Sequence, residues 1–243
     1  MLTKAQNFRA GLRDGLPICF GYFAVSFAFG IQAAGIGLSI PEAAVISAAN
    51  LTSAGQFAAL GIIAAGASYL ELAFTQLVIN LRYFLMSCAL SQRLAPEMRF
   101  AHRFGIAYGM TDEIFAVSCS RPAPLSPYYS YGLIAAAVPG WVLGTTLGAA
   151  AGNILPSVLT NALGIALYGM FIAIVVPPAK ENRVVAGVAV LSMIVSAVFT
   201  FAPYLKTISS GFRIILVTLL VAGGAAWLFP IPDKPVKEDD HAA

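Results

Sequence analysis

Eight long runs of mostly apolar residues, separated by short polar stretches, divide the chain. A helix needs about 20 apolar residues to cross the hydrocarbon core of a bilayer, and each run has about that length or more. The pattern therefore predicts an all-α, polytopic membrane helix bundle. The runs cover residues 16–35, 41–68, 70–90, 100–120, 129–151, 160–177, 183–202 and 212–229.

The composition supports a membrane protein with one domain. The 243 residues are 59% hydrophobic and 10% charged, whereas soluble proteins are about 25% charged. We expect an interfacial amphipathic segment at 1–15, a transmembrane permease domain at 16–230 and a disordered cytoplasmic tail at 231–243. The positions of the basic residues, in the loops, fit membrane orientation better than nucleic-acid binding.

The basic residues also predict which runs cross the membrane completely. They gather at 4–13, 93–103, 121, 180–183 and 234–237, and short basic loops mark the cytoplasmic side. If all eight runs crossed once, loop 93–103 would lie outside. The conflict disappears if 41–68 and 100–120 are broken or re-entrant. We therefore expect about six full spans plus two such segments, both termini inside, and Lys206 and Arg213 as exceptions to the rule.

The segment 100–120 is too polar to enter lipid alone. Asp112 and Glu113 together cost about 5–7 kcal/mol at mid-membrane, whereas the Phe, Ile and Val side chains of the segment return at most about 3 kcal/mol. The segment must line a cavity or pack inside the bundle.

A polar stripe runs along the segment 70–90. Gln76, Asn80, Tyr83 and Ser87 recur at helical spacing and share one face, which must meet protein or water. Arg82 lies about twelve residues, or about 18 Å of helix, from the charges of the flanking loops, so it needs an anion within the bundle. Asp112 and Glu113 are the candidates. The pair is either a static structural ion pair or part of a substrate or proton site.

The stretch "NLTSAGQFAAL" at 50–60 gathers Asn50, Thr52, Ser53 and Gln56 beside Gly55. A helix broken at this point would offer a half-helix N-terminus, whose N–H groups favour an anion such as a carboxylate. The alternative is that these side chains form hydrogen bonds that hold helices together.

A GxxxG ladder follows in "PGWVLGTTLGAAAGN". Gly140, Gly144, Gly148 and Gly152 predict close helix packing, with a partner helix either in this chain or in another subunit.

Enzyme and cofactor signatures are absent from the sequence. It contains no P-loop, no GxSxG, no HExxH and no dinucleotide-binding glycine loop, and its three cysteines have no metal-site spacing. We therefore expect neither an enzyme nor a cofactor or metal site.

Four blocks of sequence resemble the AzlC-type family of branched-chain amino acid exporters. They are "FRAGLRDGLPICFGYFAVSFAFG", "SAGQFAALGIIAAGAS", "LVINLRYFLMSCAL" and "AYGMTDEIFAV", and they occur in the family's order. The resemblance implies the large subunit of a permease in the bacterial inner membrane, with a small AzlD-type membrane subunit as its partner. It also implies export of branched-chain amino acids. The motif polar residues map onto Asp14, Gln56, Asn80, Arg82, Asp112 and Glu113.

The combined hypothesis is a proton-coupled secondary exporter of neutral apolar amino acids. The substrate carboxylate would meet N–H groups near Gly55, with Gln56 and Asn80. The ammonium would meet Asp112 or Glu113, either of which would also carry the proton. The expected substrate-binding residues are Asn50, Ser53, Gln56, Asn80, Arg82, Tyr83, Asp112 and Glu113, with Phe57, Phe84 and Phe115 as weaker candidates for the side-chain pocket. The alternatives are a channel-like pore for a small solute and a non-transporting membrane scaffold.

Overall fold

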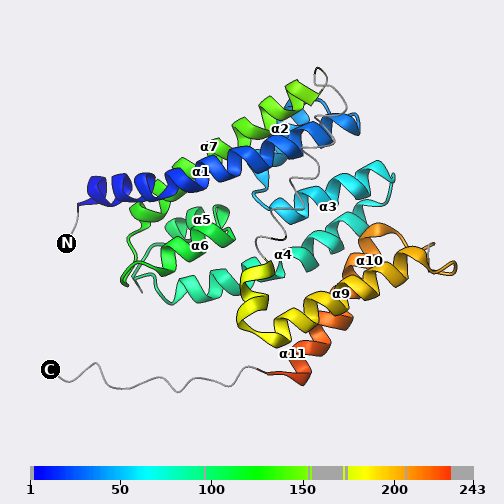
Figure 1. Cartoon of the computed structure of the whole chain (residues 1–243). Helices are drawn as coiled ribbons and strands as arrows, with labels where there is room; N and C mark the ends of the chain where they lie inside the picture. Colours follow the sequence, from blue (N-terminus) through cyan, green and yellow to red (C-terminus); the bar gives the residue numbers. More distant parts are fainter. Residues whose placement is uncertain are drawn as a thin grey trace. The chain divides into compact units, whose positions relative to one another are not determined.

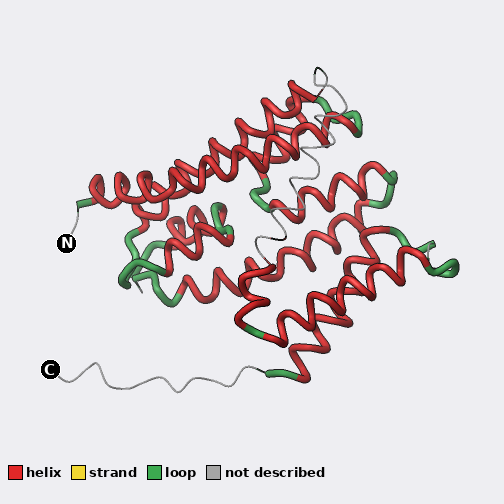
Figure 2. Tube along the Cα trace, viewed as in Figure 1, coloured by secondary structure: helices red, strands yellow, loops and turns green. Residues whose placement is uncertain are grey.

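The computed structural model describes residues 3–95, 97–152, 154, 172, 175–205 and 207–230, and their regular structure is helical (Figures 1 and 2). The chain divides into two compact units, Met1–Ile172 and Ala173–Ala243. The helices of the first unit are α1 (Lys4–Gly35), α2 (Ile40–Ala49), α3 (Ser53–Ala64), α4 (Tyr69–Ser91), α5 (Phe100–Tyr108), α6 (Asp112–Cys119) and α7 (Pro127–Gly152). The second unit contains α9 (Arg183–Phe201), α10 (Ser210–Val217), the π-helical turn η1 (Thr218–Gly223) and α11 (Gly224–Leu228).

The predicted polytopic helix bundle is confirmed. Five helical stretches of the described residues are long and apolar enough to cross a membrane: Lys4–Gly35, Tyr69–Ser91, Pro127–Gly152, Arg183–Phe201 and Ser210–Leu228. The sixth expected span, at 160–177, lies almost entirely outside the described residues, as do Lys206 and the expected tail at 231–243.

The first helix includes both the expected interfacial segment and the first span. Thr3 caps α1 by accepting a hydrogen bond from Gln6 N, and the Gln6 side chain accepts one in return from Thr3 N. The helix is 32 residues long, or about 48 Å, whereas the hydrocarbon core is about 30 Å thick. About a third of α1 therefore extends beyond the core.

Helices α1 and α7 run parallel and in close contact along their length (Figure 1). Gly132 lies against Phe8 and Leu12 near the start of α1, and Gly148 lies against Phe27 further along it. A Cβ at either glycine would collide with the backbone of α1. The ladder predicted at 140–152 therefore packs against a helix of the same chain, and glycines of α1 complete the contact from the other side.

The first predicted broken segment is broken where the polar residues gather. Helix α2 ends at Ala49, Asn50 is extended, and α3 starts at Ser53. Thr52 caps α3, because its side chain accepts a hydrogen bond from Gly55 N at 3.3 Å. The two half-helices form a hairpin rather than one continuous helix (Figure 1).

The second predicted broken segment repeats this construction. Helix α5 ends at Tyr108, and α6 begins after Thr111, whose side chain accepts a hydrogen bond from Ile114 N at 3.3 Å. Each break thus places a threonine at the N-cap of the returning half-helix. Figure 1 shows the two hairpins entering the first unit from opposite ends, joined by α4, which runs the length of the unit.

The basic loops of the first unit gather at one end. Arg121 bonds Asp14 of α1 at 2.6 Å and contacts the ring of Tyr129 at the start of α7, and Leu94 pairs with Leu125. The hydrogen bond to Asp14 raises the pKa of Arg121 above its usual value. The start of α1, the loop after α4 and the start of α7 therefore lie at the same end of the first unit, which agrees with the prediction that these basic segments share one side of the membrane.

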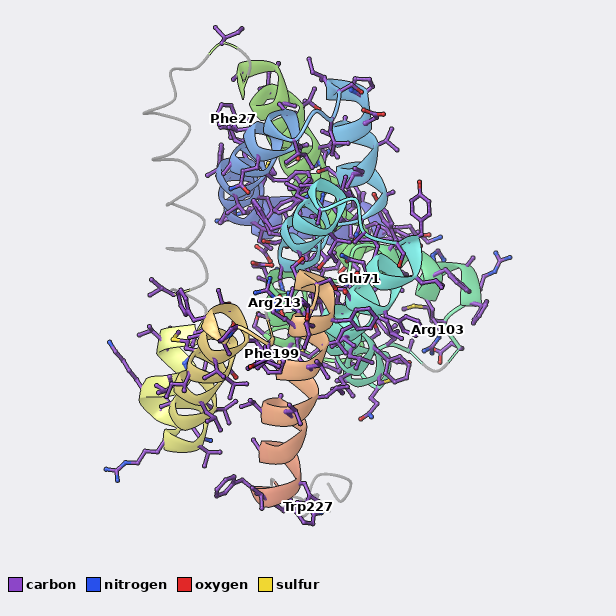
Figure 3. All side chains as sticks on the ribbon, turned by 90° about the vertical axis from the view of Figure 1, so that its right-hand side faces the viewer. Phe27, Glu71, Arg103, Phe199, Arg213 and Trp227 are labelled. Atoms are coloured by element: carbon purple, nitrogen blue, oxygen red, sulfur yellow. The ribbon has the colours of Figure 1, made fainter. Side chains whose placement is uncertain are left out.

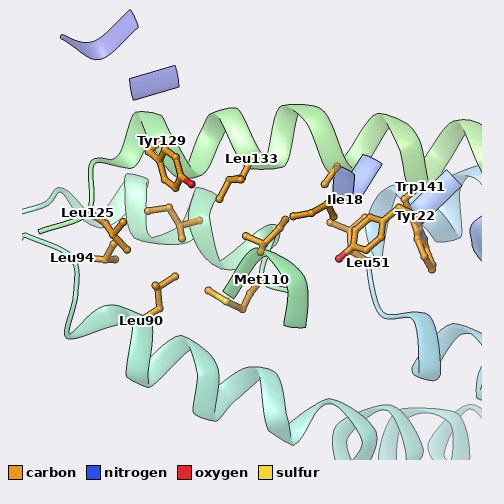
Figure 4. Packing of buried hydrophobic residues seen from close by; sticks show 13 residues of the cluster. Ile18, Tyr22, Leu51, Leu90, Leu94, Met110, Leu125, Tyr129, Leu133 and Trp141 are labelled. Atoms are coloured by element: carbon orange, nitrogen blue, oxygen red, sulfur yellow. The ribbon is translucent and has the colours of Figure 1, made fainter. Parts of the chain in front are cut away.

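A buried cluster of apolar residues fills the space between the α1–α7 pair and α4, α5 and α6 (Figure 4). At one end Tyr22 and Trp141 meet edge to face, with ring centroids 5.2 Å apart. Met110, at the second helix break, belongs to the same cluster, so both the break and the aromatic pair rest on one core.

The second unit is a separate group of helices. Helix α9 packs against α10 and η1, and Arg213 Nη1 donates to Thr200 Oγ1 at 3.2 Å. Trp227, in α11, is 84% exposed, which fits a residue at the membrane interface (Figure 3).

Candidate functional site

The two helix breaks and α4 border an open cavity of about 380 Å³. This volume lies within the range of about 300–1,000 Å³ that is common for small-molecule sites. One wall comes from each break, and the third comes from the predicted polar stripe of α4. The lining residues are Ala49, Asn50, Leu51, Thr52, Asn80, Tyr83, Phe84, Ser87, Ala107, Tyr108 and Met110.

Helix ends provide much of the polarity of this cavity. Ala49 and Asn50 are at the carbonyl end of α2, Tyr108 is at the carbonyl end of α5, and Thr52 is at the N–H end of α3. The Tyr108 hydroxyl donates to Ala48 O at 2.6 Å, so it satisfies a terminal carbonyl of α2 and ties the two hairpins together. The cavity thus has both electropositive and electronegative backbone ends at its walls.

The stripe on α4 is hydrogen-bonded to the first break. Thr52 Oγ1 donates to Asn80 Oδ1 at 2.6 Å, and Asn80 Nδ2 donates to Gln76 Oε1 at 3.2 Å. Gln76 Nε2 then donates to Gly55 O at 2.8 Å. These bonds hold the start of α3 in a defined position against α4.

Arg82 forms an ion pair with Asp112, one of the two acids predicted for it. Arg82 Nη1 lies 2.8 Å from Asp112 Oδ2, and Arg82 Nη2 donates to the Tyr83 hydroxyl at 3.1 Å. The guanidinium also lies 4.9 Å from the centre of the Tyr83 ring. Because Tyr83 lines the cavity, the ion pair is in contact with one of its walls.

Glu113 has a different partner. Its Oε2 lies 2.6 Å from the hydroxyl of Tyr22 on α1, and the same hydroxyl lies 2.6 Å from Thr111 Oγ1. Tyr22 and Thr111 are both buried, whereas Glu113 is exposed on the surface of the described chain. The two adjacent acids therefore belong to separate polar groups.

Gln56 is fully buried and belongs to a third polar group. Its Nε2 donates to Ser47 Oγ at 3.0 Å, and its Oε1 accepts from Trp141 Nε1 at 2.9 Å. Ser47 Oγ and Thr145 Oγ1 are 2.7 Å apart. This group joins both halves of the first hairpin to α7. Gln56 therefore has the alternative role considered from the sequence, in which its side chain forms hydrogen bonds that hold helices together.

The structure thus brings part of the predicted site together. Asn50, Asn80 and Tyr83 line the cavity, but Ser53, Gln56, Arg82, Asp112 and Glu113 are not among its lining residues. Of the three phenylalanines, Phe84 lines the cavity, Phe57 packs against Phe29 and Phe115 packs against the core.

Several residues of these networks were missed in the sequence. Tyr22, Ser47, Trp141 and Thr145 lie in apolar runs and carry no signal besides being polar or aromatic. The sequence did contain a pattern that points to Thr111. The stretches "LTSAGQFA" and "MTDEIFA" each place a threonine a few residues before a phenylalanine and an alanine, and these two threonines are the N-caps of α3 and α6.

Among the described residues, no group of three or more His, Cys, Asp or Glu side chains is placed to hold a metal ion.

Comparison with known proteins identifies the family. The family model described as "AzlC protein" matches residues 17–155, which is more than half of the chain. The chain belongs to the AzlC family. The match includes both broken segments, α4, the last 19 residues of α1 and the whole of α7, so the cavity lies within the AzlC region.

Two relatives extend the AzlC match. An "Uncharacterized membrane protein" of Archaeoglobus fulgidus is 34% identical over 190 residues, which cover 77% of this chain and 83% of the relative. "Inner membrane protein YgaZ" of Escherichia coli is 29% identical over 206 residues, covering 82% and 84%. No solved structure matches the chain. This AzlC protein is therefore a membrane protein with transmembrane helices.

Proposed function

We propose that this AzlC protein is a secondary transporter that exports branched-chain or similar neutral apolar amino acids, coupled to protons. It acts in the cytoplasmic membrane, the inner membrane of a bacterium, as the large subunit of a two-component permease with a small AzlD-type subunit. Membership of the AzlC family and the name of the relative YgaZ support the location and the class. The cavity at the two helix breaks is the observation that carries the proposal.

The cavity has the chemistry for an amino acid with an apolar side chain. The N–H end of α3 attracts a carboxylate, and the carbonyl ends of α2 and α5 attract an ammonium. Asn80 and Ser87 add hydrogen-bonding groups, while Leu51, Phe84 and Met110 form apolar wall. The ammonium is therefore assigned to helix ends at the cavity rather than to Asp112 or Glu113.

The hairpins also provide a way to alternate access. Transporters of several classes bind substrate near mid-membrane at discontinuous helices and expose the site to each side in turn. Here the two hairpins enter from opposite ends (Figure 1), and residues of both line the cavity. Movement of one hairpin would open the cavity to one side of the membrane, while the other hairpin keeps it closed to the opposite side. A carboxylate on α6 would couple that movement to a proton.

A matched pair of substitutions tests the cavity. Ser87 lines it, whereas the neighbouring Cys88 is exposed and does not. In inverted membrane vesicles with an acidic interior, the parent chain, produced with its small subunit, accumulates labelled leucine. Ser87→Leu fills the cavity and lowers the leucine transport efficiency by about tenfold or more, equivalent to about 1.4 kcal/mol. Cys88→Leu transports like the parent.

Other outcomes would contradict the proposal. If the unsubstituted protein passes leucine without saturation and never against the leucine gradient, it is a pore. A parent that moves no leucine, valine, isoleucine or methionine but still binds a small membrane subunit is a scaffold. Equal transport by the Ser87→Leu and Cys88→Leu variants would place the substrate elsewhere.

A further inference from the structure

The two adjacent acids of α6 differ in whether protonation would break an ion pair. Asp112 forms an ion pair with Arg82 at 2.8 Å. Glu113 bonds the neutral Tyr22 hydroxyl at 2.6 Å and has no basic side chain within 4.0 Å in the part of the chain that the structure describes. Asp112 and Glu113 occupy the first turn of α6 and point about 100° apart around the helix.

Protonation of Asp112 would leave Arg82 without its anion. An arginine keeps its proton under all ordinary conditions, and an unpaired cation within a membrane bundle is costly. Loss of one member of such a pair is more costly than loss of both. The Arg82–Asp112 pair therefore favours staying charged throughout a transport cycle.

Protonation of Glu113 leaves every hydrogen bond of its group intact. When Glu113 is ionised, Tyr22 donates to the carboxylate. When Glu113 is protonated, its O–H donates to the Tyr22 oxygen, and Tyr22 turns its own proton to Thr111 Oγ1, also 2.6 Å away. Both states fit one arrangement of heavy atoms, so the carboxyl can take up and release a proton without strain on its neighbours.

The surroundings of Glu113 do not supply a competing charge. Helices α1, α4 and α7 pack against α6. Helix α7 carries no charged residue, and Arg82 on α4 is already paired with Asp112. The titratable and charged groups near Glu113 are Tyr22 from α1, Arg82 and Tyr83 from α4, and Asp112 itself. The tyrosines at the start of α7 have their partners elsewhere, at His102, Asp14 and Arg121.

We infer that Glu113 is the proton carrier, that Tyr22 and Thr111 position its proton, and that Arg82–Asp112 remains an ion pair. This inference rests on the proposed function, because it assigns the coupling step of that transport. One carboxylate oxygen of Glu113 gains a proton from water on one side of the membrane and returns it to water on the other side.

The experiment separates coupling from substrate movement in the same inverted vesicles. Leucine counterflow needs no net proton movement, whereas accumulation does. With one proton exchanged per leucine, a gradient of one pH unit sustains about tenfold accumulation in the parent. Glu113→Gln keeps counterflow, but its accumulation ratio falls to one. Glu42→Gln is the matched control, because Glu42 bonds Ser39 at the start of α2 and belongs to none of these polar groups, and it accumulates leucine like the parent.

Two further variants test the roles of the neighbours. Arg82→Gln with Asp112→Asn removes both charges together, so its rate falls but its steady-state accumulation ratio stays above one. Tyr22→Phe removes a donor to the ionised carboxylate. Its transport therefore becomes half-maximal at a more alkaline pH than that of the parent, and an unchanged pH profile would exclude Tyr22 as a positioning residue.

The failures are distinguishable. Absence of leucine counterflow in the parent rejects the proposed function. Parent-like accumulation by Glu113→Gln overturns the assignment of Glu113, as does loss of accumulation with intact counterflow in the Arg82→Gln/Asp112→Asn variant. If Glu113→Gln does not reach the membrane, accumulation by the Arg82→Gln/Asp112→Asn variant decides between the two acids. Glu113→Asp keeps a carboxyl group and is expected to accumulate leucine.

Discussion

The contact between α1 and α7 makes a sharp prediction about two glycines of one helix. Gly21 and Gly30 both lie within α1, but a Cβ at Gly21 would meet nothing within 4 Å. A Cβ at Gly30 would lie 2.6 Å from Ala149 N and closer still to Thr145 O. Gly21→Ala and Gly30→Ala are therefore the same chemical change in an open and in a filled position.

The magnitude follows from the distances. Ordinary contact begins near 3.4 Å, so the helices must separate by at least 0.8 Å at Gly30, the difference between 3.4 and 2.6 Å. Overpacking of this kind costs about 1–3 kcal/mol, and backbone atoms cannot turn aside as side chains can. Replacement of glycine by alanine in a helix returns up to about 1 kcal/mol. That gain is common to both variants, so Gly30→Ala should be less stable than Gly21→Ala by about 1–3 kcal/mol.

The assay is reversible unfolding of the purified protein in detergent micelles, followed by tryptophan fluorescence and helical circular dichroism. Gly21→Ala is expected to equal or exceed the parent in the free energy of unfolding. If Gly30→Ala were as stable as Gly21→Ala, the close parallel contact of α1 and α7 would be wrong.

The remaining predictions concern topology and the tie between the hairpins. In a chain without its native cysteines, Ser39→Cys and Ala67→Cys, which flank the first hairpin, should react with an impermeant thiol reagent from the same side of the membrane. Arg99→Cys should react only from the opposite, cytoplasmic side, and labelling of Ser39→Cys and Ala67→Cys from opposite sides would contradict a re-entrant hairpin. Tyr108→Phe removes the bond to Ala48 O and should lower stability by about 0.5–1.5 kcal/mol in the same unfolding assay, with a slower leucine flux in vesicles. No loss of stability would mean that this bond does not hold the hairpins together.

The sequence could predict the broken segments because the forces involved are local. The cost of Asp112 and Glu113 within an apolar run is a property of that run alone, whatever the run packs against. The position of loop 93–103 is likewise set by its own charges. Both arguments required 100–120 to be other than a simple span, and the structure breaks it between Tyr108 and Asp112.

The site could be predicted only in part. Asn50, Asn80 and Tyr83 were found because a polar side chain within an apolar helix must face something other than lipid. The same rule selected Gln56, which faces Ser47 and Trp141 instead of the cavity. A polar stripe indicates that a helix face is covered, but it does not distinguish a neighbouring helix from a substrate.

By itself, the sequence determined the helical bundle and the two breaks, and it predicts the side of the membrane on which the basic loops lie. Each of these depends on the transfer of a short segment from water to lipid. Only the tertiary structure decided that the glycine ladder packs against α1, that Arg82 pairs with Asp112, and that Glu113 pairs with Tyr22. Tyr22 and Glu113 are 91 positions apart, and bonds between such residues depend on how whole helices pack, because backbone and side-chain preferences act only within a few residues of each position.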